Sequence, residues 1–74
     1  MDIRMINKKD EVINVSSLHL KVINNWLVAM NNEEKAIVIE TYENAEEAHE
    51  ALVHTWEMIE MANKQGLQSI TIHT

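Results

Sequence analysis

Apolar residues in the second half of the chain recur at three- and four-residue steps, and this spacing predicts one long amphipathic helix over 44–66. Asn44 can cap the start through its side-chain oxygen, and Glu47 stands three residues later, which approximates a capping box. Lys64 in the last turn and Gly66 beyond it predict the C-terminal end. A helix of about 21 residues is roughly 30 Å long.

The two sides of this helix differ in character. The side expected to pack on the rest of the protein is apolar and consists of Ala45, Ala48, Leu52, Thr55, Ile59 and Ala62, with Ala51, Trp56 and Met58 beside it. Trp56 is expected to pack against the sheet. Val53 and Met61 depart from the pattern and are expected at the edges or in solvent. The opposite side is acidic and carries Glu46, Glu50, Glu57 and Glu60.

The rest of the chain alternates apolar and polar residues over short stretches, which is typical of half-buried β-strands. The expected strand segments are 2–6, 12–15, 18–23, 26–30, 36–42 and, after the helix, 68–73. We therefore predict a single α+β domain spanning residues 1–74. It has an antiparallel β-meander of about four short strands, one long helix packed on one face, and a final C-terminal strand.

The pair Asn24-Asn25 predicts a two-residue hairpin turn, because asparagine tolerates positive φ better than most residues. In this register Val22 faces the same side as Leu27, and Leu20 the same side as Ala29.

One helix covers one face of a sheet, so the other face is expected to expose Ile23, Trp26, Val28 and Met30. A patch of that kind usually marks an interaction surface, and tryptophan is enriched among binding hot spots. The alternative is a turn shifted by one residue, or a bulge at Ser16-Ser17 that twists the sheet over itself.

Composition narrows the options further. The net charge is −6, and the stretch 33–60 holds nine acidic residues and one base, Lys35. The chain has no cysteine and no proline, and Gly66 is its only glycine, which argues against disulfides and Gly-rich phosphate loops. No apolar run is long enough to span a membrane, and residues 1–10 do not resemble a signal peptide. We expect a cytoplasmic protein with no membrane partner.

Basic residues are too few and too diluted to provide the footprint of a nucleic-acid binder. Catalytic groups are equally hard to find. Three serines, Ser16, Ser17 and Ser69, have no recognisable elbow or base partner. Paired carboxylates such as Glu46 and Glu50 lie on an exposed helix face, which lacks the buried surroundings that a general acid needs. The sequence therefore predicts neither enzyme activity nor a cofactor.

The chain has four histidines, and one of them suggests a metal ligand. Glu50 and His54 are four residues apart and share a helix face, so both could bind one ion. Because a site needs further ligands, which only His19 or His73 could add, we expect solvated side chains and no metal site.

Three runs of the sequence suggest a known group: "INVSSLHLKVINNWLVAM", "AIVIETYENAEEAHEALVHTWEMIEMANKQG" and "ITI". Together they resemble small proteins of no assigned activity carried by prophages and mobile elements of Gram-positive bacteria. The matching positions are Tyr42, Asn44, Glu47, Ala48, Leu52 and Gly66. All are structural, so the resemblance implies a fold and no catalytic residues.

Two functions from different classes follow. The first is a protein-interaction module, homodimeric, that pairs through a sheet edge or through the face around Trp26. The second is an inhibitor of a nucleic-acid-handling protein, in which Glu46, Glu50, Glu57 and Glu60 imitate phosphates for a basic cleft. A weak metal or small-ligand binder is a third, less favoured reading.

Overall fold

The computed structural model describes residues 1–74 and confirms the α+β class. Its elements in chain order are β1 (Asp2–Ile6), β2 (Val12–Asn14), β3 (His19–Ile23), β4 (Trp26–Met30), β5 (Ala36–Thr41), α1 (Ala45–Lys64) and β6 (Ser69–His73). Every expected strand is present, with each end within one residue of its predicted position. Alternation of apolar and polar residues was thus a sufficient guide to where strands form.

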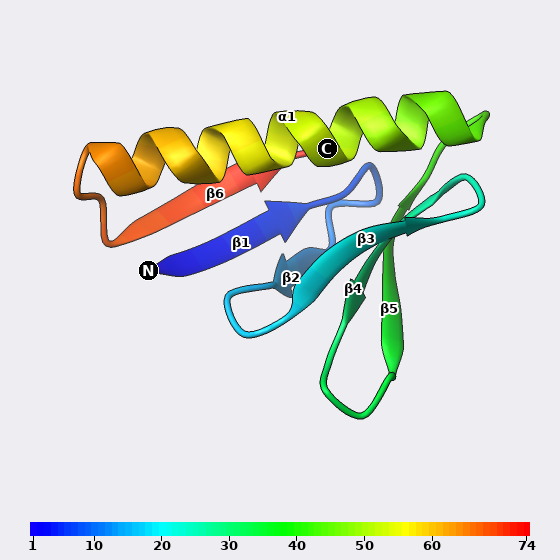
Figure 1. Cartoon of the computed structure of the whole chain (residues 1–74), viewed down its shortest axis with the longest axis horizontal. Coiled ribbons are helices and arrows are strands. Elements are labelled where there is room, and N and C mark those ends of the chain that lie inside the picture. Colours follow the sequence, from blue (N-terminus) through cyan, green and yellow to red (C-terminus); the bar gives the residue numbers. More distant parts are fainter.

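The strands divide into two three-stranded sheets, which the sequence did not reveal (Figure 1). In one sheet the order is β2–β1–β6, where β1 pairs antiparallel with β2 and parallel with β6. The other sheet is the antiparallel meander β3–β4–β5. The pair Ser16-Ser17 lies between β2 and β3 and so connects one sheet to the other. The hydroxyl oxygen of Ser16 accepts a hydrogen bond from the N–H of Ile3 in β1 at 2.6 Å.

The core forms where the two sheets meet the inner side of α1. It consists of Met5, Val15, Leu27, Ala29, Ile39, Leu52 and Ile72. The helix contacts β3 and β4 of one sheet and β6 of the other, so it spans the junction between them (Figure 1). Burying side chains of this size stabilises the fold by about 1.5–3 kcal/mol each.

The start of α1 follows the predicted capping pattern. The side-chain oxygen of Asn44 accepts a hydrogen bond from the N–H of Glu47 at 2.8 Å. The Glu47 carboxylate reaches back to the N–H of Glu43, at 3.4 Å, rather than to the N–H of the cap residue. The N–H of Glu47, one of those that a helix start leaves without an intrahelical partner, is thereby satisfied, and the chain before the cap is tied to the first turn.

The end of α1 is a Schellman motif. Gly66 has a φ of 72°, and its N–H donates to the carbonyl of Asn63 at 3.1 Å. The N–H of Leu67 donates to the carbonyl of Ala62 at 3.0 Å, which completes the paired hydrogen bonds of the motif. The left-handed conformation explains why a glycine stands at this position.

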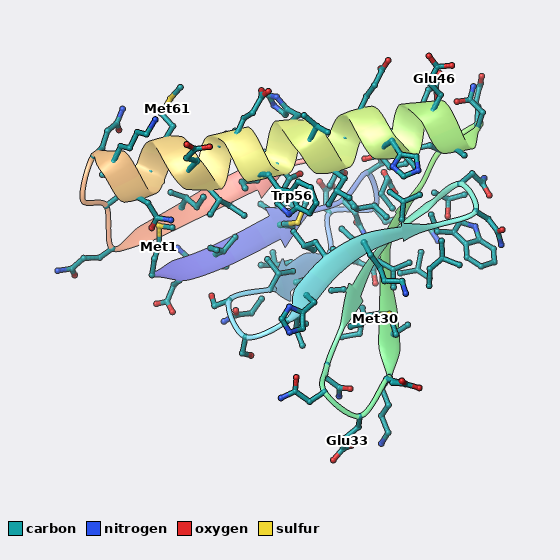
Figure 2. The ribbon with its side chains drawn as sticks, viewed as in Figure 1. Met1, Met30, Glu33, Glu46, Trp56 and Met61 are labelled. Carbon is teal, nitrogen blue, oxygen red and sulfur yellow. The ribbon has the colours of Figure 1, made fainter.

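The inner side of α1 is narrower than predicted. Its buried residues are Ala48, Leu52, Thr55 and Ala62. The prediction that Trp56 packs in the core was wrong, because 52% of its surface is exposed. Trp56 follows the buried Thr55 by one residue, about 100° around the helix, which places it at the border of the packed side (Figure 2). Val53 and Met61 are exposed as expected, and α1 is not apolar enough to cross a membrane.

Candidate interaction surface

The hairpin of β4 and β5 extends from the body of the molecule on the side away from α1 (Figure 1). We call this hairpin, residues 26–41, the β4–β5 arm. Its tip is the turn 31–35, and Glu33 lies at the outermost point (Figure 2). The side-chain oxygen of Asn31 accepts hydrogen bonds from the N–H groups of Glu33 and Lys35, both at 3.0 Å. Glu34 has a φ of 62°, as the third loop residue of such a turn requires.

The turn between β1 and β2, residues 7–11, is built in the same way. The side-chain oxygen of Asn7 accepts hydrogen bonds from the N–H groups of Lys9 and Glu11, both at 3.0 Å. Asp10 has a φ of 60° and occupies the position that Glu34 occupies in the arm. The two turns share a backbone but differ in charge, since Lys8 and Lys9 stand where the tip has Asn32 and Glu33.

The predicted register of β3 and β4 is confirmed. Val22 lies opposite Leu27 and Leu20 opposite Ala29, with a two-residue turn between the strands. Only the first turn residue, Asn24, has a positive φ (54°), which excludes a type I′ turn, where both central residues have one.

The predicted open face is less exposed than expected. Trp26 is 38% exposed, whereas Ile23 and Met30 are half-buried. The prediction that Val28 is exposed was wrong, because only 1% of its surface reaches solvent. Val28 is the middle residue of the central strand and lies between Lys21 and Val38 in the register. Side chains on both sides therefore cover it, although it lies outside the core cluster.

A β-bulge in β5 was not predicted. The register between β4 and β5 shifts at Leu27, so that two residues, Ile39 and Glu40, face the interior there. Both are buried, and Glu40 is only 9% exposed. The one sequence signal was a glutamate directly after an apolar residue inside a strand, where strict alternation would place it on the outer face.

The β1–β2 turn docks on this bulge. The side-chain amide of Asn7 donates to the carbonyl of Ile39 at 3.0 Å, and the N–H of Lys8 donates to the Glu40 carboxylate at 3.1 Å. The hydroxyl of Thr74 approaches the same carboxylate at 3.5 Å. The buried charge of Glu40 is thus satisfied by the other sheet, and the turn covers the C-terminal half of the β5 edge.

The N-terminal half of the β5 edge has no such cover. At one end of the β4–β5 ladder Tyr42 N–H donates to Asn25 O at 2.9 Å, and at the other Asn31 N–H donates to Lys35 O at 3.1 Å. Hydrogen-bonded and non-hydrogen-bonded pairs alternate along an antiparallel ladder. When this alternation is counted inward from either end, Ala36 and Val38 fall at non-hydrogen-bonded pairs with β4. Their N–H and C=O groups therefore point away from β4.

Large apolar side chains accompany these outward groups. Ile37 is 47% exposed and Val38 is 48% exposed, and they project from opposite faces of the strand. A cleft of about 450 Å³ begins at Val38 and continues between the C-terminal half of β5 and the β1–β2 turn. It is lined by Asn7, Lys8, Lys9, Glu11, Val38, Ile39, Glu40 and Thr41.

Tyr42 lies beside this region, just after β5. Its hydroxyl is buried and has no hydrogen-bond partner. Burial raises the pKa of the phenol above its ordinary value, and the nearby Glu40 carboxylate raises it further. The ammonium group of Lys8 lies 5.5 Å from the ring centroid, within cation–π range.

The acidic side of α1 is a separate surface. Glu46, Glu50, Glu57 and Glu60 are all exposed, and Glu46 and Met61 point away from both sheets (Figure 2). Lys64 pairs with Glu60 at 3.4 Å, on the same side of the helix. Glu50 and His54 do share a face, but no three His, Asp or Glu side chains lie close enough together to hold a metal ion.

Comparison with protein families, curated proteins and solved structures finds no match to this chain. The resemblance to small prophage proteins therefore stays a prediction.

Proposed function

We propose that the chain is a small intracellular, non-enzymatic protein-interaction module that forms a homodimer, and that the β4–β5 arm is its contact surface. The observation that supports this most directly is the open edge of β5, with Ile37 and Val38 exposed on its two faces. Exposed strand edges are templates for pairing with another chain, and proteins that stay monomeric usually cover or interrupt them.

The bulge, the inward-pointing Glu40 and the docked β1–β2 turn protect only the C-terminal half of this edge. The stretch 36–39 contains no proline and no charged residue, and β5 has a neighbour on one side only. Trp26 and Met30 adjoin it on the outer face of the sheet and add apolar surface near the same edge. A contact through the arm would bury these side chains as well.

An affinity experiment from the native host tests the role of the arm. Wild-type protein, Trp26→Ala, Val38→Asp and Glu50→Lys are immobilised side by side. We expect Val38→Asp to lose the captured proteins, including the chain itself, and Glu50→Lys to retain them. Trp26→Ala should lose other captured proteins and keep more of the chain itself. Equal capture by wild type and both arm variants would contradict the proposal.

A second candidate is an acidic inhibitor of a nucleic-acid-handling protein. It is favoured by the placement of Glu46, Glu50, Glu57 and Glu60 on one exposed side of α1, over about 21 Å. The same capture experiment separates it from the first, because Glu50→Lys would then lose a basic partner while the arm variants keep it. Binding that does not weaken with salt would count against this candidate.

A further inference from the structure

The free part of the β5 edge is short and has defined ends. The docked β1–β2 turn occupies the carbonyl of Ile39, and the tip turn begins before Ala36. A strand that pairs with this edge therefore has three residues, Ala36 to Val38, to align with. Its hydrogen bonds must go to Ala36 and Val38, because Ile37 bonds inward to β4.

A second copy of the same segment satisfies this requirement. When two copies run antiparallel, Ala36 of each faces Val38 of the other. The free N–H and C=O groups of each residue then meet those of the residue opposite. This arrangement makes four backbone hydrogen bonds. It also puts Ile37 opposite Ile37 as a non-hydrogen-bonded pair, with Cα atoms about 4.5 Å apart and side chains in contact.

Charges at both ends favour the same partner. When the register is continued beyond Ala36, Glu34 of one copy lies opposite Glu40 of the other. Glu40 is the residue whose carboxylate accepts a hydrogen bond from the β1–β2 turn. The Glu40 carboxylate is buried and already accepts the N–H of Lys8, and the Glu11 carboxylate accepts from Asn7 at 3.1 Å. The charges that meet the tip are therefore the exposed ammonium groups of Lys8 and Lys9, with the Asp10 carboxylate beside them. At the tip Lys35 lies 3.9 Å from Glu33, so Glu34 carries the charge without a partner.

We infer that two copies of the chain pair antiparallel through the edges of their β5 strands, with Ile37 on the two-fold axis and the acidic tip of each arm beside Lys8 and Lys9 of the other. This rests on the proposed homodimer through the β4–β5 arm and adds the strand edge and the register of the contact. The two three-stranded meanders become one six-stranded sheet, and the contact is isologous, as in most homodimers.

Proline at position 36 tests the strand pairing. Ala36→Pro removes an N–H that points away from β4 and changes little else, so the hairpin should stay intact. We expect the wild type to sediment as a dimer at about 1 mM, and Ala36→Pro to dimerise at least about tenfold more weakly with an unchanged circular dichroism spectrum. The Trp26→Ala variant should keep the dimer or weaken it less.

Cysteine substitution tests the register. The chain has no cysteine, so a single introduced thiol reports only on its own position. Ile37→Cys should give a disulfide-linked dimer under mild oxidation. Val38→Cys should not, because the two residues 38 would be separated by more than the 4.4–6.8 Å between Cα atoms that a disulfide spans.

A charge reversal tests the ends of the contact. Glu34→Lys should weaken the dimer about three- to tenfold, and Glu60→Lys, the same charge change on the helix, should not.

A dimer that Ala36→Pro leaves intact, or equal cross-linking at positions 37 and 38, would overturn the edge pairing while leaving the arm as a contact surface. A wild type that stays monomeric at about 1 mM would overturn both the edge pairing and the homodimer, and the capture experiment would then decide whether the arm contacts other proteins.

Discussion

At the scale of single residues, Asn7 joins the two sheets. Its side chain is 7% exposed and makes all of its hydrogen bonds within the protein, one of them to the bulge carbonyl of Ile39. Asn31 makes the same two turn bonds in the arm, but its side-chain amide has no partner strand. The two asparagines therefore separate the contribution of a turn from that of a contact between sheets.

We expect Asn7→Ala to lower the free energy of unfolding by about 2–4 kcal/mol, because it breaks the turn and leaves the Ile39 carbonyl buried without a partner. Asn31→Ala should cost no more than about 1 kcal/mol. Urea unfolding of both variants measures the difference. Equal losses would show that Asn7 stabilises its turn and nothing more.

Tyr42 gives the molecule a dependence on alkaline pH. Its folded-state pKa is raised, so the unfolded chain releases the phenol proton first. The associated stability is fully present below about pH 10 and is lost as the pH rises from there through the folded-state pKa.

Tyr42→Phe should remove this loss, and at neutral pH it should leave stability unchanged or raise it by up to about 1 kcal/mol, since the hydroxyl has no partner. The measurement is the difference in unfolding free energy between wild type and variant from about pH 8 to pH 11. A difference that stays constant over this range would contradict the assignment.

At the scale of elements, local signals predicted the helix and strands well. Asn44, Glu47 and Gly66 act at the ends of α1 as the sequence indicated. The bulge at Glu40 and the burial of Val28 could not be predicted in the same way, because both depend on which strands lie beside them. Trp56 was misplaced for a related reason, since the width of the buried side depends on what the helix packs against.

The N-cap of α1 provides a direct test at this scale. Asn44→Ala should lower the unfolding free energy by about 1 kcal/mol, because the Glu47 N–H loses its acceptor. Asn44→Asp keeps an acceptor and adds favourable charge at the helix start, so it should be close to wild type. Thermal unfolding followed by circular dichroism distinguishes the two, and an alanine variant as stable as the aspartate variant would be inconsistent with capping.

At the scale of the whole molecule, two small sheets and one helix share a single core. Sequence alone gave no means of assigning strands to sheets, because β1 finds its parallel neighbour at the other end of the chain. The candidate surface was predicted only in part: Trp26 is exposed, but the free β5 edge emerged from the pairing, not from the pattern.

The shared core makes each sheet dependent on the other. Ile72 is 1% exposed and pairs with Met5, so Ile72→Ala should cost about 2–5 kcal/mol. A domain of this length has a total stability of about 4–11 kcal/mol. A large fraction of the Ile72→Ala variant should therefore be unfolded near body temperature. Val53→Ala, at an exposed site, should change stability by less than about 0.5 kcal/mol. Denaturant melts of the two variants should therefore differ clearly, and similar midpoints would argue against one core.

The pairing of β1 with β6 has a consequence for the order of folding. Ile6 accepts a hydrogen bond from the N–H of Thr74 at 3.0 Å, across 68 positions of sequence. Closing so long a loop is slow compared with forming a hairpin. During synthesis the β3–β4–β5 meander and α1 have all of their residues before β6 exists, whereas β1 has only the short β2 beside it. The strand β1 therefore lacks its parallel neighbour until β6 has been made, and until then the place of Ile72 in the core stays open.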